Sequence, residues 1–235
     1  MAKRRSNGEG TLRLRADGRW EMTIMDGFRD DGKRRFKTFY GKTQKEVKAK
    51  AKGYRDAKDS DIVIITSGVG RKPGQTRIEL AQTNVNILKQ ITPQIVSVAP
   101  NALYVIVSNP VDIMTYVFTK ISGIPESQII GSGTILDTSR LQSELARRFC
   151  ISPKNVHAHV YGEHGDSSFV PWSLVHIANN HIDVYKENSP DKDRIEWNQD
   201  YAEIEEFVKK SGGRIIENKG ATFFAVAMSV CHICK

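Results

Sequence analysis

Two continuous apolar runs, DIVIIT at residues 61–66 and ALYVIV at residues 102–107, constrain the fold of this chain most strongly. Both are rich in β-branched residues and lack apolar–polar alternation, as expected of strands buried on both faces of a parallel sheet. Apolar residues at helical spacing over 76–91 and 134–149 predict helices after these runs. The alternation of strands and helices predicts an α/β fold with right-handed crossovers.

Residues 1–52 have a different pattern. TLRLR, RWEMTIM and KRRFKTFY alternate apolar and polar residues, which predicts three short half-buried strands. Asp-Gly dipeptides at 17–18 and 31–32 separate them and suit tight hairpins. TQKE at 43–46 has the form of a capping box and predicts a helix that runs through about residue 52. We therefore expect a small three-stranded sheet followed by a helix.

Charge separates the same segment from the rest of the chain. Residues 1–52 hold 16 Lys and Arg against 7 Asp and Glu, whereas residues 53–235 hold 19 against 20. This asymmetry makes the first segment a candidate for binding a polyanion such as DNA, although a basic face that is merely solvated is the alternative. A sheet of this width fits the major groove of DNA. The cations expected to contact DNA are Arg13, Arg15, Arg19, Arg34, Arg35 and Lys37.

The run RRSNGEGTLRLRADGRWEMTIMDGFRDDGKRRFKTFYGKTQKEVKAK is similar to the N-terminal arm-type DNA-binding module of tyrosine recombinases, the phage and transposon integrases. The resemblance covers about the first fifth of the chain. It implies DNA contact through residues 1–52 and no strand cleavage, because no recombinase catalytic domain follows.

Other classes of protein are disfavoured by composition. The longest weakly polar run, residues 221–234, is shorter than the ~20 apolar residues of a membrane helix, so we expect no membrane span. The N-terminus lacks the apolar core of a secretory signal, and three cysteines suit a reducing compartment, so we expect a cytoplasmic protein. No second Cys or His pair accompanies Cys231 and Cys234, so we expect no metal site.

Polar motifs follow the predicted strands. SGVGRKPGQTR follows the first one, and because its glycines do not form G-x-G-x-x-G, we interpret it as a mobile cationic loop that can swing Arg77 toward an anionic substrate. SNPVD follows the second and leaves Asn109 at the carboxyl edge of the sheet, where ligands bind in open α/β folds. GSGTILDTSR opens a helix with Asp137 and Arg140 on one face, and YGEHGD carries His164.

KPGQTR, SNPVD, GSGTILDTSR, GEHGDSS and KGAT occur in the order typical of the L-lactate/malate dehydrogenase family, which residues 54–235 resemble. The resemblance implies NAD as cofactor and a small 2-hydroxy or 2-keto acid as substrate. By it His164 is the acid/base, Asp137 orients its imidazole, and Arg140 binds the substrate carboxylate. Arg77 would polarise the carbonyl, and Asn109 would support the nicotinamide and the substrate oxygen. The residues expected to bind the cofactor are Gly68, Ser108 and Asn109.

Two substrates compete within this resemblance. Arg71 occupies the loop position that faces the variable end of the substrate, where an arginine suits the second carboxylate of malate. Glu163 and Thr222 are instead similar to the lactate branch, in which a threonine narrows the pocket around a methyl group. We expect L-lactate dehydrogenase chemistry, the interconversion of pyruvate and lactate, with malate dehydrogenase as the alternative.

The chain departs from the family at both ends. It lacks the strand–GxGxxG–helix start of a dinucleotide fold, because the basic module of residues 1–52 stands in its place. We expect a partial Rossmann domain over 53–150, a partial α+β substrate domain over 151–235, and a chain that is inactive alone. DIVIIT would then be an exposed edge strand. A dehydrogenase remnant, a DNA-binding module with an inert passenger, and a fusion or misassembly product remain open, as does homo-oligomerisation.

Overall fold

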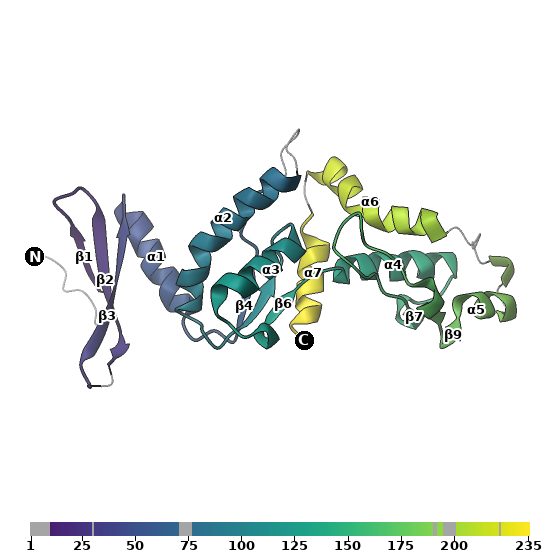
Figure 1. Cartoon of the computed structure of the whole chain (residues 1–235), viewed down its shortest axis with the longest axis horizontal. Helices are drawn as coiled ribbons and strands as arrows, with labels where there is room; N and C mark the ends of the chain where they lie inside the picture. The colour runs from purple at the N-terminus through teal and green to yellow at the C-terminus, as the bar shows by residue number, and fades with distance from the viewer. Residues whose placement is uncertain (1–9, 30, 71–76, 190–191, 195–200, 221) are drawn as a thin grey trace, which may run out of the picture. The chain divides into compact units, whose positions relative to one another are not determined.

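The computed structural model describes residues 10–29, 31–70, 77–189, 192–194, 201–220 and 222–235 (Figure 1). The chain divides into two compact units. The first contains residues 1–61 with 93–102, and the second contains residues 62–92 with 103–235. In the described part of the chain, no helix is long and apolar enough to cross a membrane.

The first unit contains an antiparallel sheet of strands β1 (Thr11–Leu14), β2 (Trp20–Phe28) and β3 (Arg34–Gly41). The three strands predicted from alternation are therefore confirmed, and so is the turn at 17–18. Gly18 has a φ of 78° and donates its N–H to the Arg15 carbonyl at 3.0 Å. Because a side chain is strained at this φ, glycine is the residue that closes such a hairpin at low cost.

Helix α1 (Gln44–Ala57) covers one face of this sheet. The Thr43 hydroxyl accepts the Glu46 N–H at 3.1 Å, which confirms the predicted N-cap. Glu46 reaches back to the N–H of Lys42 at 2.7 Å, one residue before the position of a standard capping box. The core between helix and sheet contains Met22, Ile24, Val47 and Ala51.

The second unit begins with a parallel sheet in the order β4–β5–β6. The predicted strands are β4 (Ile62–Ile65) and β5 (Leu103–Ile106), and β6 is Ile129–Gly131. The helices that connect them are α2 (Arg77–Val96) and α3 (Val111–Ser122), and the 3-10 turn η1 (Glu126–Gln128) precedes β6. The α/β class and the parallel pairing predicted from the apolar runs are confirmed.

The burial predicted for these strands is wrong on one face. Ile62, Ile64 and Leu103 are 40%, 45% and 42% exposed, although each belongs to a continuous apolar run. Directly paired residues share a face, so Ile62 and Leu103 lie together, whereas Val105, the partner of Ile64, is 2% exposed. β4 lies at the edge of the three-stranded sheet, as expected of DIVIIT.

The remainder of the second unit surrounds helix α4 (Ile135–Arg148). Its core includes Leu141, Leu145, Phe149, Ile177 and Ile204, all at most 1% exposed. A small antiparallel sheet, in the order β7–β8–β9, contributes to this core. The elements are η2 (Pro153–Asn155), β7 (Val156–His157), η3 (Trp172–Leu174), β8 (His176–Ile177), β9 (Asn180–His181), α5 (Ile182–Asn188), η4 (Lys192–Arg194), α6 (Tyr201–Lys219) and α7 (Phe224–Ile233).

Candidate active site

The carboxyl ends of β4 and β5 lie side by side, because the two strands are parallel and paired in register. Ser108, just after β5, is buried and donates its hydroxyl to the Ser67 carbonyl at 2.6 Å. Ser67 is placed in the same way after β4. Its own hydroxyl is the one buried side-chain oxygen that lacks a hydrogen-bond partner within the described residues. Polar side chains therefore gather at the edge where the sequence predicted a ligand.

Asn84 of α2 holds the two loops that leave this edge. Its Oδ1 accepts the N–H of Val69 at 2.8 Å, and its Nδ2 donates to the carbonyl of Asn109 at 2.7 Å. The side chain is 1% exposed, so these bonds are made away from water. Gly68 has a φ of 151°, and a Cβ at this position would lie 3.1 Å from Oδ1 of Asn84. Glycine here allows the loop to pass close to the amide.

Helix α4 supplies the carboxylate and the guanidinium of the site. Asp137 is 4% exposed and lies in the first turn of the helix. Arg140, three residues later, donates from Nη1 to Asp137 Oδ1 at 3.0 Å, and its side chain is 14% exposed. The i to i+3 spacing seen in GSGTILDTSR thus places both groups on one helix face, as predicted.

His164 meets the other oxygen of the same carboxylate. Its Nδ1 donates to Asp137 Oδ2 at 2.5 Å, and its backbone N–H donates to Oδ2 of Asp112, in the first turn of α3, at 2.9 Å. The loop that carries it is closed by the Tyr161–Phe169 bridge. Because Nδ1 is used by Asp137, Nε2 is the ring nitrogen left for a substrate.

The protonated form of His164 is favoured. The hydrogen bond to Asp137 raises the pKa of His164 above its ordinary value, and this effect exceeds the opposing effect of burial. The negative charges of Asp137 and Asp112 also raise this pKa, while the positive charge of Arg140 lowers it. The imidazole is therefore suited to hold a proton that it can donate to a substrate oxygen.

A cavity of about 60 Å³ lies beside the imidazole. His164 and Asn109 line it together with apolar residues of the β5–α3 corner, the start of α4, and α7. This volume is small compared with the roughly 300–1,000 Å³ of typical small-molecule sites. Its lining residues are Val107, Asn109, Val111, Ser132, Gly133, Ile135, Leu136, His164, Val226 and Ser229.

The structure brings together most of the predicted site, and it adds residues that the sequence argument missed. Asp137, Arg140 and His164 are in contact, and Asn109 shares their cavity. Asp112 was missed, although it is the last residue of the SNPVD motif. Asn84 lies in a helix whose apolar spacing gives no sign of its role.

The structure does not test the roles predicted for three further site residues. Arg71 and the loop around it lie outside the described residues. Arg77 is the first residue of α2, and Thr222 is half-buried just before α7 without lining the cavity. Their roles remain predictions.

NAD fits this edge of the sheet in part. The buried Ser67 hydroxyl without a partner and the exposed Asn109 supply polar groups suited to a nicotinamide amide or a ribose. The sequence contains no G-x-G-x-x-G segment, however, and residues 10–57 form an antiparallel sheet and a helix instead of a strand–loop–helix phosphate site. The fit is therefore limited to one end of the dinucleotide.

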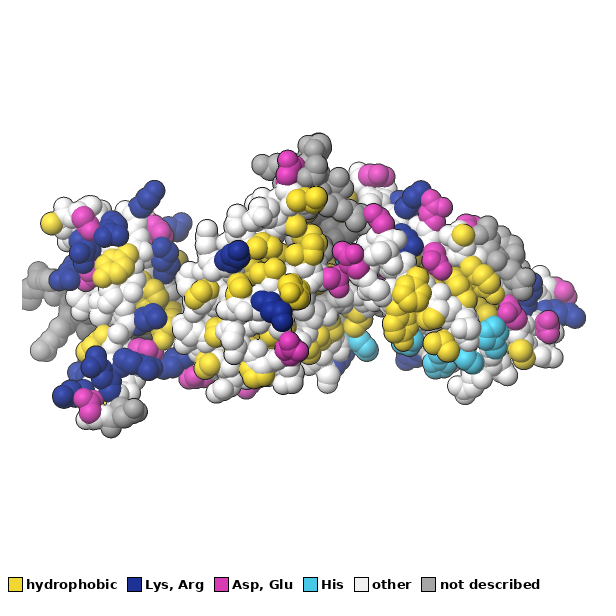
Figure 2. All heavy atoms as spheres, in the orientation of Figure 1, with side chains coloured by type: hydrophobic (Ala, Val, Ile, Leu, Met, Phe, Trp, Pro, Cys, Tyr) yellow, Lys and Arg dark blue, Asp and Glu magenta, His cyan; other side chains and the backbone are white. Residues whose placement is uncertain are grey.

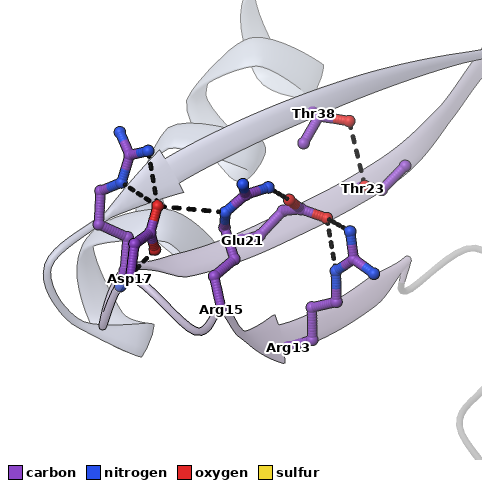
Figure 3. A network of polar contacts seen from close by, with 7 residues as sticks. Arg13, Arg15, Asp17, Glu21, Thr23 and Thr38 are labelled. Atoms are coloured by element: carbon purple, nitrogen blue, oxygen red, sulfur yellow. Dashed lines mark hydrogen bonds and ion pairs between the residues drawn. The ribbon is translucent and has the colours of Figure 1, made fainter.

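Cations gather over strands β1–β3 in the space-filling view (Figure 2). Glu21, whose side chain is 7% exposed, accepts from Arg13 Nε and from Arg15 Nη1, each at 2.7 Å (Figure 3). The hydrogen bond from Arg15, followed by that from Arg13, lowers the pKa of Glu21 against the opposing effect of desolvation. Arg19 pairs with Asp17 at 2.8 Å. These arginines are thus partly neutralised by carboxylates of their own unit.

The six cations predicted to contact DNA do not share one face of the sheet. Arg13 is paired in register with Glu21, and Arg34 follows the same alternation as Phe36 on the face away from α1. Lys37 is instead paired with the buried Ile24 and lies 5.6 Å from the Tyr54 ring of α1. Arg35 alternates with Lys37 and binds Asp26 at 3.2 Å. Arg35 and Lys37 therefore lie on the helix side of the sheet, because strand alternation turns them away from the face that carries Arg13 and Arg34.

Fold and site together define an α/β protein with a histidine–aspartate acid/base pair beside an arginine. Comparison with known proteins gives the family. Residues 37–131 match the lactate/malate dehydrogenase NAD-binding domain, and residues 134–235 match the lactate/malate dehydrogenase alpha/beta C-terminal domain. Through these two segments the chain belongs to the lactate/malate dehydrogenase family. The first match begins inside β3, within the segment that resembles integrase modules.

Individual relatives agree with this assignment. The chain is 45% identical over 183 residues to an L-lactate dehydrogenase of Clostridium botulinum (strain Hall). The matched region covers 77% of this chain and 56% of the relative. The chain is 47% identical over 189 residues to L-lactate dehydrogenase 1 of Clostridium acetobutylicum. This match covers 80% of this chain and 59% of the relative.

Solved structures show the same extent of similarity. The lactate dehydrogenase MGS-M5 from a deep-sea metagenome library matches with a TM-score of 0.70 at 39% identity, covering 77% of this chain and 56% of that one. The minor L-lactate dehydrogenase of Enterococcus mundtii matches with a TM-score of 0.69 at 38% identity and the same coverage. The chain thus spans slightly more than half the length of these relatives.

Proposed function

We propose that the second unit carries the substrate-binding and proton-transfer machinery of an NAD-dependent 2-hydroxy acid dehydrogenase in the cytoplasm, with lactate and pyruvate as the substrate pair. The observation that carries this proposal is the contact of Asp137 with both His164 and Arg140, one partner at each carboxylate oxygen. A 2-keto acid presents a carboxylate next to a carbonyl. The site offers the guanidinium of Arg140 to the carboxylate and the proton of His164 to the carbonyl oxygen.

NAD, when bound, supplies or accepts the hydride. In the direction of reduction, Arg140 holds the substrate carboxylate through donors that Asp137 leaves unused. His164 donates the proton from Nε2 to the keto oxygen as negative charge develops there. Asp137 stabilises the imidazolium before the transfer and keeps Nδ1 protonated after it, which fixes the reactive tautomer.

We further propose that the chain alone shows no appreciable turnover. Proximity and orientation contribute roughly 7–11 kcal/mol to favourable reactions of this kind, and they require the dinucleotide to be held at its pyrophosphate as well as at its nicotinamide. The sequence has no G-x-G-x-x-G segment to hold that pyrophosphate.

The test is NADH oxidation with pyruvate or oxaloacetate, measured for the full chain alone and with the separately expressed first half of a family member added. Turnover that requires the added half, and that His164→Ala abolishes, is expected. Robust turnover by the chain alone would contradict the second proposal, and absence of turnover in both mixtures would contradict the first. The preferred keto acid, and its change on Arg71→Ala or Thr222→Ala, decides between lactate and the malate alternative.

A second candidate function, DNA binding by the first unit, is favoured by one observation. The sheet face away from α1 combines Arg13 and Arg34 with the half-exposed ring of Tyr40, over which the Arg15 guanidinium lies at 5.4 Å. Cations beside an aromatic ring on an open sheet suit a nucleic-acid backbone. The remainder of the chain would then be an inert passenger.

For this candidate, we expect the full chain to bind duplex DNA with an affinity that falls steeply as salt rises. Replacing Arg13 and Arg15 by alanine should weaken binding. Because Glu21 already neutralises part of their charge, the slope of log affinity against log salt should fall by less than the loss of two phosphate contacts would give. Fluorescence anisotropy of a labelled duplex measures both. Replacing Lys209 and Lys210 of α6 by alanine removes the same charge elsewhere and serves as the control. An affinity indifferent to salt would exclude this function.

A further inference from the structure

The loop at residues 161–169 is held to the rest of the molecule at the residue that carries the imidazole. The backbone N–H of His164 donates to Oδ2 of Asp112 at 2.9 Å, across 52 residues of sequence. Asp112 is half-buried, and it lies in the first turn of α3, directly after the SNP corner that follows β5. The bond therefore joins the segment that matches the NAD-binding domain to the segment that matches the C-terminal domain.

His164 is consequently held at two points by two different carboxylates. Asp112 binds the backbone N–H, and Asp137 binds the ring at Nδ1. The charged groups that face the imidazole are Asp137 and Arg140 from α4 and Asp112 from α3. The residues that α7 contributes to the cavity, Val226 and Ser229, carry no charge.

We propose that Asp112 is a positioning residue for His164, which acts by fixing the backbone of the loop that carries the imidazole. This inference rests on the proposed role of His164. A backbone N–H needs only an oxygen acceptor, which an asparagine would also supply. The charge does more, because Arg140 disfavours the protonated imidazole and Asp112 opposes that effect.

Two substitutions separate the two parts of this role. Asp112→Asn keeps an oxygen that can accept the His164 N–H but removes the charge, whereas Asp112→Ala removes both. The measurement is an NMR titration of the full chain labelled with ¹⁵N-histidine, which follows the ring nitrogens of His164 for titration and tautomer. Amide exchange of His164 reports the backbone hydrogen bond. Neither readout requires turnover or NAD.

We expect Asp112→Asn to shift the titration midpoint of His164 downward while its amide stays protected. Asp112→Ala should shift the midpoint downward and also lose the protection of the amide. Glu126→Gln, an exposed carboxylate of η1 without a described contact to His164, serves as the matched charge control and should change neither. If Asp112 has a merely structural role, Asp112→Ala loses the amide protection of His164. In that case Asp112→Asn leaves the titration midpoint of His164 unchanged.

The result that overturns the inference is a midpoint in Asp112→Asn equal to that of the unmodified chain while Asp137→Asn lowers it. Failure of the proposed function looks different. If Asp137→Asn also leaves the midpoint unchanged, the histidine–aspartate pair itself is absent in solution. Circular dichroism of each variant identifies those that do not fold. If Asp112→Ala unfolds, the titration midpoint of His164 in Asp112→Asn still tests the inference, because this variant preserves the shape of the side chain and the hydrogen-bond acceptor.

Discussion

At the scale of single residues, the site is organised around one buried carboxylate with two partners. Asp137 is 4% exposed, and it contacts Arg140 through one oxygen and His164 through the other. A buried polar group without partners is costly, and Asp137 has one partner at each carboxylate oxygen. Substitution of Asp137 therefore affects both Arg140 and His164.

We expect Asp137→Asn to destabilise the fold more at acidic than at alkaline pH. The pKa of His164 is raised in the folded chain, so the folded state binds this proton more tightly than the unfolded state. The resulting stabilisation is fully present below the ordinary pKa of 6.5 and is lost as pH rises through the folded value. Urea unfolding at about pH 5.5 and about pH 8.5 measures the difference.

His164→Gln provides the control for this experiment. In that background the effect of Asp137→Asn should lose the part of its pH dependence that comes from the imidazole. If the loss of stability in Asp137→Asn instead grows toward alkaline pH, the pKa of His164 is lowered, not raised, in the folded chain.

At the scale of elements, helices α4 and α6 are joined by an ion pair from a buried arginine of α4 to an exposed glutamate of α6, as well as by their apolar core. Arg148 is 7% exposed and donates from Nε to Glu144 Oε1 at 2.8 Å, and from Nη2 to Glu203 of α6 at 2.9 Å. The packing of these helices matters for the site, because α4 carries Asp137 and Arg140. Loss of the pair would loosen the element on which the chemistry depends.

Arg148→Ala should destabilise the fold by about 1–3 kcal/mol, because it removes one charged hydrogen-bond partner of the buried Glu144 carboxylate, which keeps Arg147. Arg147 is the matched control. It contacts the same Glu144 at 2.9 Å, but its side chain is 57% exposed, so Arg147→Ala should cost about 0–1 kcal/mol. Chemical unfolding of both variants makes the comparison. Equal losses would show that burial of the arginine does not decide the effect.

At the scale of the whole molecule, the second unit leaves apolar sheet surface uncovered. β4 is an edge strand, and Ile62 and Ile64 on one of its faces are 40% and 45% exposed. An apolar edge strand can pair with another chain through its free backbone groups. Association of the chain with itself, or with a complementary fragment, is therefore expected to begin at β4.

We expect the chain to self-associate as its concentration rises, and Ile64→Lys to reduce this association, because a lysine on an edge strand opposes pairing. Light scattering after size-exclusion chromatography measures the mass. Ile113→Lys on α3, where the isoleucine is also 40% exposed, is the matched control and should leave association unchanged. Equal effects of the two lysines would point to general apolar contact instead of strand pairing.

The amino-acid sequence by itself determined the type of the elements with a strong local pattern, because side-chain period and local caps are encoded within a few neighbouring residues. Alternation identified β1 to β3, the apolar runs identified β4 and β5, and the Thr43 hydroxyl marked the start of α1. The spacing of Asp137 and Arg140 likewise sufficed to place them on one helix face. Helices α3, α5, α6 and α7 and the short strands β6 to β9 were not predicted.

Only the tertiary structure decided what lies opposite each of these faces. Asp112 and His164 are 52 residues apart in sequence, and no local pattern states that the α3 corner meets the loop at 161–169. The exposed face of β4 was hidden for the same reason, because a run of isoleucines looks alike whether one or both faces are covered. Period fixes which residues share a face, but the partner of that face depends on chain-wide packing, and so does the electrostatic environment that raises the pKa of His164.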